Sequence, residues 1–112
     1  MDAALLETLC ADLGPHGAED VVCRAMEELG QLLFQIHEIA IVGKREDLHR
    51  SLRRLAAIAD QIGLCGLAQV ARDVMACIEY GDTIAEAATL ARLSRTGERS
   101  LSALWDLQDL SV

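Results

Sequence analysis

An unbroken repeat of apolar residues at three- and four-residue spacing runs between Ala18 and Val42. Its members are Val22, Ala25, Met26, Leu29, Leu32, Leu33, Ile36, Ile39 and Ala40. Residues three and four apart share one face of an α-helix, so the repeat predicts a long amphipathic helix with one core stripe. The chain is 52% hydrophobic but only 3% aromatic and has one Pro. Its core must therefore be built from Leu, Ala, Ile and Val, which favours an all-α domain.

Turn residues divide the remaining sequence into further helices. Asp2 is placed to cap a short first helix, which is predicted to end near Leu13 at the loop Gly14-Pro15-His16-Gly17. Gly43 is expected to close the long helix, because glycine reaches a left-handed backbone without a Cβ clash. A third helix is predicted from about Glu46 to Ile62.

Gly63 is expected to end the third helix, and Gly66 to open a fourth. The next turn is predicted at residues 80–82, with Asp82 or Thr83 as the N-cap of the last helix and Glu86 placed to return the capping bond. Gly97 marks a position where this helix can kink or break. Short turns make sequential helices antiparallel, so residues 1–112 are predicted to form one domain, an antiparallel up-down four-helix bundle with a short N-terminal lid helix.

The charge of the chain is unevenly distributed. With 18 acidic and 10 basic residues its formal net charge is -8, which argues against nucleic acid as a partner. Half of the bases nevertheless lie in residues 44–54, which carry +3 while the rest of the chain carries -11. The bases of this basic island are Lys44, Arg45, Arg50, Arg53 and Arg54. Such an asymmetry indicates a site for an acidic partner.

The sequence gives no sign of export or of a membrane span. Its acidic N-terminus has the wrong charge for a secretory signal, and no apolar run approaches the ~20 residues of a membrane helix. We therefore expect a cytoplasmic protein. Four cysteines without a C-x-x-C pair are expected to be reduced and buried: Cys10, Cys23, Cys65 and Cys77.

A search for catalytic spacing finds no metal-binding H-E-x-x-H, no phosphate-binding glycine loop and no G-x-S-x-G. We accordingly predict no metal, no cofactor and no enzymatic activity. One helical face still combines unusual groups. His49, Arg53, Ala56 or Ala57, and Asp60 follow one another at helical spacing, beside the core line of Leu48, Leu52, Leu55 and Ala59. A cationic group next to small residues is a surface on which another helix or loop could lie. The chemistry alone favours the simpler explanation, a solvated helix face with alanines that suit the helix.

This segment resembles the histidine-containing phosphotransfer (HPt) domains of bacterial two-component phosphorelays. Their third helix carries a pattern like H-x-L-K-G-S/A-A-x-x-x-G, followed after three residues by L-A. Gly63 matches the closing glycine, Leu55 the leucine two after the phosphoryl-accepting histidine, Ala59 the small residue, and Leu67 and Ala68 the final pair. The order and length of the helices fit the family along the whole chain. The resemblance thus implies an HPt-like bundle.

The chain departs from the family at the reactive position. Ten residues before Gly63 stands Arg53 where the family has its histidine, and Ala56 and Ala57 replace the family's lysine and glycine. Arginine stays protonated and offers no nucleophilic nitrogen to a phosphoryl group. His49 lies one turn away, about 6 Å along the helix. The resemblance therefore implies a docking module without phosphotransfer; the alternative is an active protein that uses His49.

The partner implied by the resemblance is a receiver domain or a histidine kinase. Receiver domains are the usual partners of HPt domains, and acidic residues surround their phosphorylated aspartate. A guanidinium can bind such a carboxylate or phosphate group through two parallel hydrogen bonds. The predicted partner-binding residues are His49, Arg50, Arg53, Arg54, Ala56, Ala57 and Asp60. A second interpretation is self-association or a non-signalling adaptor. Leu-rich residues 100–112 contain the only Trp, Trp105, a residue type common at interface hot spots, which makes a homodimer one candidate assembly. The alternative is that Leu101, Leu104 and Trp105 cover the end of the bundle.

Overall fold

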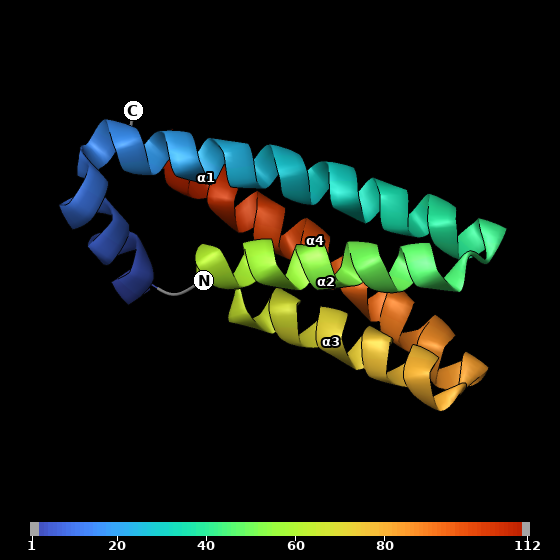
Figure 1. The fold of residues 1–112 in the computed structure, drawn as a ribbon. Helices are drawn as coiled ribbons and strands as arrows, with labels where there is room; N and C mark the ends of the chain where they lie inside the picture. The colour runs from blue at the N-terminus through green and yellow to red at the C-terminus, as the bar shows by residue number, and fades with distance from the viewer. Residues whose placement is uncertain (1–2, 111–112) are drawn as a thin grey trace.

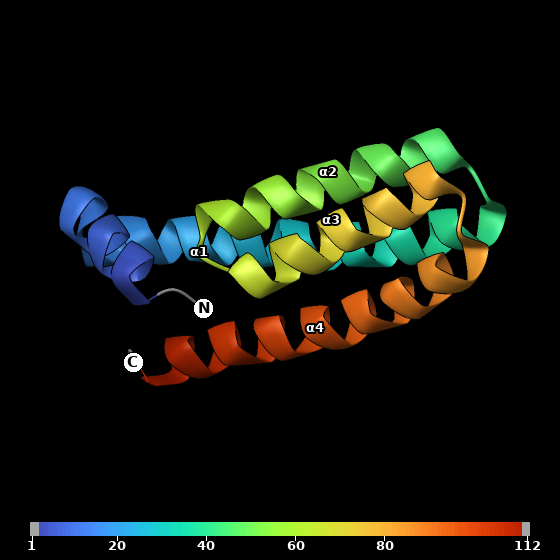
Figure 2. The same cartoon turned by 90° about the horizontal axis from the view of Figure 1, so that it is seen from below.

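The computed structural model describes the backbone of residues 3–110 and the side chains of residues 20–106. Four α-helices follow one another: α1 (Ala3–Val42), α2 (Arg45–Gln61), α3 (Cys65–Tyr80) and α4 (Thr83–Leu110). Each helix packs against the next, and α4 returns beside α1 (Figures 1 and 2). The two interhelical turns α1–α2 and α3–α4 lie at one end of the bundle in both views. The predicted all-α four-helix bundle is therefore confirmed.

The N-terminal part of the prediction is wrong in one respect. α1 is one continuous helix from Ala3, without the predicted loop at residues 14–17, but its N-terminal part turns sharply away from the rest of the helix (Figure 1). Proline removes one backbone hydrogen bond from a helix, at a cost of about 3 kcal/mol, and glycine lowers helix propensity by about 1 kcal/mol. Neither residue forbids helical dihedral angles, so a 40-residue helix can contain both. No separate lid helix occurs in the described residues, and the packing expected of the lid lies outside the side chains that the structure describes.

The turns on either side of α2 confirm the predicted roles of two glycines. Gly43 and Gly63 have φ angles of +84° and +79°, a region that L-residues with a side chain rarely enter. After α2, the N–H of Leu64 donates to the carbonyl of Ala59 over 2.8 Å. This bond satisfies a carbonyl that the end of the helix would otherwise leave open. Gly63 thereby fixes how α3 leaves α2.

The first turn of α4 differs in part from the predicted capping pattern. Asp82 is the cap as predicted, because its carboxylate accepts a bond of 3.0 Å from the N–H of Ala85. Glu86 does not return the bond through its side chain. Its carboxylate is almost buried and pairs with Arg45 at the start of α2. This bond raises the pKa of the Arg45 guanidinium and joins the two turns at that end of the bundle.

The core consists of aliphatic side chains from all four helices. Leu29, Leu52, Leu67 and Leu93, one from each helix, are at most 1% exposed. α4 continues through Gly97, where a kink or break was predicted. A Cβ at this glycine would lie 2.7 Å from Cδ1 of Leu33, so the missing side chain allows α1 and α4 to approach closely. Glycine is thus used here for close packing within a continuous helix.

The cysteines are less buried than predicted. Cys65 is exposed at the first position of α3, whereas Cys23 and Cys77 are half-buried. Cys10 lies outside the side chains that the structure describes. They are less buried because they lie beside the apolar core stripes of their helices and not within them. Within the described residues, no helix combines the length and apolarity needed to cross a membrane.

Candidate functional site

The predicted partner-binding residues all lie on α2, but they separate into two flanks of that helix. His49 and Asp60 contact side chains of α3, and Arg54 contacts a side chain of α1. Arg53 and Ala57 are exposed. Ala56 is 5% exposed and belongs to the core, so of the two alanines Ala57 continues the exposed face.

We call the α3-facing flank the α2/α3 seam, formed by His49, Arg53 and Asp60 with Glu79 and Arg72. Asp60, which the sequence placed on a free surface, is in an ion pair with Arg72. Glu79 places its Oε1 3.1 Å from Nε2 of His49. Two of the predicted binding groups are therefore already occupied within the bundle.

Both ring nitrogens of His49 have contacts. Its Nδ1 lies 3.4 Å from Nη2 of Arg53, and its Nε2 faces the carboxylate of Glu79. A guanidinium donates hydrogen bonds and never accepts them, so Nδ1 must be the acceptor. Nε2 then carries the hydrogen and donates it to Glu79. One tautomer of His49 satisfies both contacts, and the remaining lone pair on Nδ1 points to Arg53.

Arg53 differs from the other arginines of α2. Arg45 pairs with Glu86, Arg54 with Glu28 and Arg50 with Asp47. Within the described part of the chain, Arg53 has no carboxylate partner, and its one side-chain contact is His49. The guanidinium at the centre of α2 is therefore exposed and retains most of its donors for a ligand.

The other flank of α2 faces α1 across a groove, which we call the α1/α2 groove. Seven residues line it: Glu28, Gln31, Leu32, Gln35, Arg50, Ser51 and Arg54. It holds about 300 Å³. Arg53 is not part of this lining, so the two flanks present different arginines.

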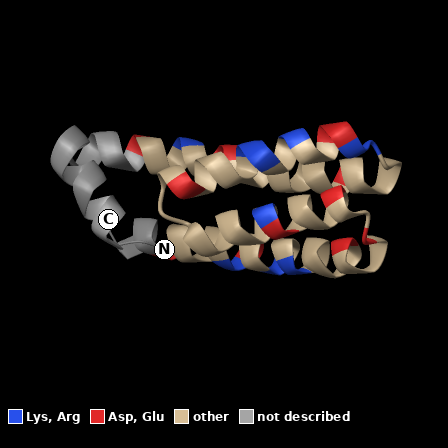
Figure 3. Ribbon diagram, turned by 60° about the horizontal axis from the view of Figure 1, so that its bottom comes forward, with Lys and Arg blue, Asp and Glu red and all other residues tan. Residues whose placement is uncertain are grey.

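Positive and negative positions alternate along the bundle (Figure 3). Three arginines of the basic island, Arg45, Arg50 and Arg54, are accordingly paired with carboxylates. Three ion pairs link neighbouring helices: Arg54–Glu28, Arg72–Asp60 and Arg92–Asp73. A fourth, Arg45–Glu86, joins the start of α2 to the first turn of α4. Among the described residues, no three His, Cys, Asp or Glu side chains gather as they would around a metal ion.

The sequence did not indicate the partners Glu28, Arg72 and Glu79. Glu79 is 30 residues from His49, and Glu28 is 26 residues from Arg54. Local spacing identifies neighbours on one helix, whereas these contacts depend on how two helices are aligned. The sequence shows only that each of these residues is charged and lies on a polar helix face. That information does not indicate which residue of another helix it pairs with.

Comparison with known proteins finds no relative. No family model matches the chain, no curated protein is significantly similar, and no solved structure matches significantly.

Proposed function

We propose that this protein is an HPt-like docking module. It binds a receiver domain or a histidine kinase of a two-component phosphorelay and does not pass on a phosphoryl group. The observation that carries the proposal is Arg53, an exposed guanidinium at the centre of α2 without a carboxylate partner among the described residues. The resemblance of residues 53–68 to the HPt pattern supports this position as the place where a receiver domain would dock.

The chemistry of Arg53 supports binding rather than transfer. A guanidinium binds carboxylate and phosphate groups through two parallel hydrogen bonds. It has no lone pair with which to attack phosphorus. A receiver's acidic phosphorylation site would therefore attract Arg53, and any phosphoryl group would stay on the receiver.

The contacts of His49 support the same conclusion. Its Nδ1 lone pair is directed at Arg53 and its Nε2 at Glu79. To become a nucleophile, the imidazole must first give up one of these contacts and then be reached by a partner docked one helical turn from Arg53. Phosphoryl transfer requires close in-line placement, which such a displacement does not provide.

The docking proposal is tested by equilibrium binding of receiver domains from the same organism to the full chain. We expect saturable binding that Arg53→Ala weakens at least about tenfold, the effect of losing one bidentate charged contact. Arg95→Ala is the matched control, because Arg95 is an exposed arginine on α4. If no receiver or kinase binds, or if both variants weaken binding equally, the proposal is wrong.

Self-association is the second candidate, and the aromatic residues favour it. The chain has one Phe, one Tyr and one Trp, and Phe34, Tyr80 and Trp105 are 60–87% exposed. Large aromatic side chains are enriched at protein interfaces. Sedimentation over a range of concentrations tests this candidate. A dimer that Trp105→Ala weakens would support it, and a monomer at all concentrations would exclude it.

A further inference from the structure

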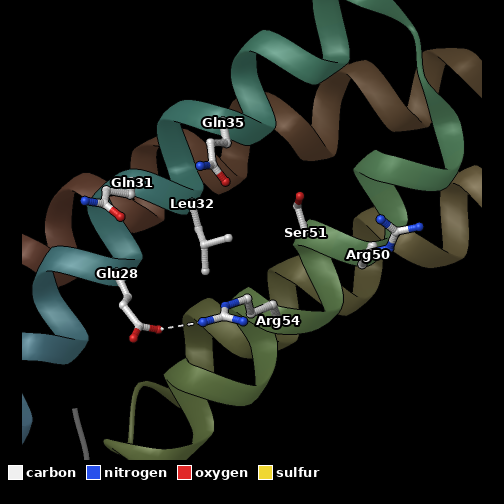
Figure 4. A pocket seen from close by; sticks show the side chains of 7 residues that line it. All are labelled: Glu28, Gln31, Leu32, Gln35, Arg50, Ser51 and Arg54. Carbon is white, nitrogen blue, oxygen red and sulfur yellow. Dashed lines mark hydrogen bonds and ion pairs between the residues drawn. The ribbon is translucent and has the colours of Figure 1, made fainter.

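The α1/α2 groove combines two cations with neutral polar groups. Arg50 and Arg54 are four residues apart on α2, so they lie about 6 Å apart along the helix axis on one side. Ser51 lies between them in the sequence, and Gln31 and Gln35 come from the opposite wall, α1. Figure 4 shows Leu32 and Ser51 in the middle of the groove, with Arg54 turned toward Glu28 at one end and Arg50 at the other end.

The ion pairs at the two arginines leave them available to a ligand. Nη2 of Arg54 lies 3.4 Å from Glu28, and Nη1 of Arg50 lies 3.7 Å from Asp47. Both arginine side chains are well exposed, at 65% and 78%. Exposed pairs at such distances contribute little stability. Each guanidinium has five N–H donors, and one carboxylate occupies at most two of them.

We propose that the α1/α2 groove binds a phosphate group, either as free phosphate or in a small phosphate monoester. Two guanidiniums match the double negative charge of the group, and their planar donors suit its oxygens. The Ser51 hydroxyl and the amides of Gln31 and Gln35 provide neutral donors for the remaining oxygens. Glu28 is the one acidic residue in the lining, and it competes with the ligand for Arg54.

The groove also offers contact to an organic substituent. Leu32 is 6% exposed and forms the apolar part of the lining. The volume of about 300 Å³ is at the lower end of small-molecule sites, which suits a small ligand. The site shares Arg50 and Arg54 with the predicted partner-binding residues, but it does not include Arg53, which carries the docking proposal. The bound species needs no protein partner, so the two proposals can fail separately.

The test is a titration of the full, isotope-labelled chain by NMR, with inorganic phosphate in one arm and phenyl phosphate in the other. We expect saturable shifts of the Ser51 backbone amide and of the side-chain amides of Gln31 and Gln35. Tighter binding of phenyl phosphate identifies a small ester as the ligand that the groove favours, whereas equal affinities identify free phosphate. Either result supports a phosphate site.

Four variants make the test specific, and the spectrum of each also shows whether it is folded. Arg50→Gln and Arg54→Gln should each weaken binding at least about fivefold, and Arg95→Gln should leave it unchanged. Glu28→Gln should tighten binding severalfold, because it removes the competing carboxylate while keeping the side-chain size. The proposal is overturned if no saturable shift occurs, if Arg50→Gln binds like the unaltered protein, or if Glu28→Gln weakens binding.

Discussion

The two flanks of α2 use the same residue types in different ways. In the α2/α3 seam, His49 and Asp60 are held by Glu79 and Arg72 from the neighbouring helix. In the α1/α2 groove, Arg54 pairs with Glu28 over 3.4 Å and Arg50 with Asp47 of its own helix over 3.7 Å, so both ion pairs are loose. The other polar residues of the groove are Gln31, Gln35 and Ser51. The seam therefore has its charges satisfied within the bundle, whereas the groove keeps donors available for a ligand.

Arg53 lies in the α2/α3 seam, yet its hydrogen-bond donors stay available to a ligand, as those of the groove arginines do. It touches His49 but has no carboxylate partner among the described residues. The charge of a helix face therefore says little about whether its side chains are available to a ligand or a partner. What matters is whether the neighbouring helix places an opposite charge at the same level.

The largest expected effect comes from the core beneath both flanks. Leu52 is fully buried, and replacing it by Ala should lower the free energy of unfolding by about 2–5 kcal/mol through lost burial and a cavity. Denaturant unfolding measures this loss. Ala57→Ser on the exposed side of α2 is the control and should change stability by less than about 0.5 kcal/mol. A loss below about 1 kcal/mol for Leu52→Ala would mean that the charged flanks, rather than the core, hold α2.

The second largest effect on stability is expected at the turn between α2 and α3, which determines how these two helices pack along the α2/α3 seam. Gly63 has a φ of +79°, so Gly63→Ala should destabilise the protein by about 1–2 kcal/mol. Gly66→Ala, three residues later in α3, has open space around the new Cβ and should stabilise by up to about 1 kcal/mol through helix propensity. Thermal unfolding of the two variants should therefore show shifts of opposite sign. A loss in both would show that space, and not backbone conformation, limits this turn.

A smaller effect distinguishes the ion pairs of the two flanks. A double-mutant cycle on Asp60 and Arg72 should give a coupling energy of about 0.5 kcal/mol that decreases with added salt. The same cycle on Glu28 and Arg54, whose closest atoms are 3.4 Å apart, should give a value near zero. Equal coupling in the two cycles would remove the difference between the seam and the groove.

The smallest effect on stability is expected at Arg53. Without a carboxylate partner among the described residues, Arg53→Ala should change the free energy of unfolding by less than about 0.5 kcal/mol. Urea unfolding of this variant beside the unaltered chain is the measurement. A clear loss of stability would indicate a structural role for the guanidinium and would weaken the case for a docking residue.

The sequence was sufficient for the fold because local rules determine most of it. The core line Leu48, Leu52, Leu55 and Ala59 is buried as predicted, and Gly43 and Gly63 close their helices. Helical spacing and backbone conformation are properties of neighbouring residues, so they can be read without the tertiary structure. The break predicted near Pro15 was wrong because a long helix can tolerate a residue of low propensity.

The site was harder to predict because its state depends on the alignment of helices. Spacing placed Asp60 on an exposed face of α2, but it could not show that Arg72 of α3 lies beside it. It also left open which of two alanines is exposed, and the bundle buries Ala56. The contact of Glu79 with His49 likewise joins residues 30 positions apart.

The fate of the phosphoryl group distinguishes a docking module from a phosphotransfer protein. The full chain is incubated with a phosphorylated receiver that binds it, and phosphate is followed by ³¹P NMR and by acid-labile label on each protein. We expect a complex that depends on Arg53 and in which all the phosphate stays on the receiver or is released. Phosphate found on this protein, and lost in His49→Ala, would show that the protein transfers phosphate and establish His49 as an acceptor.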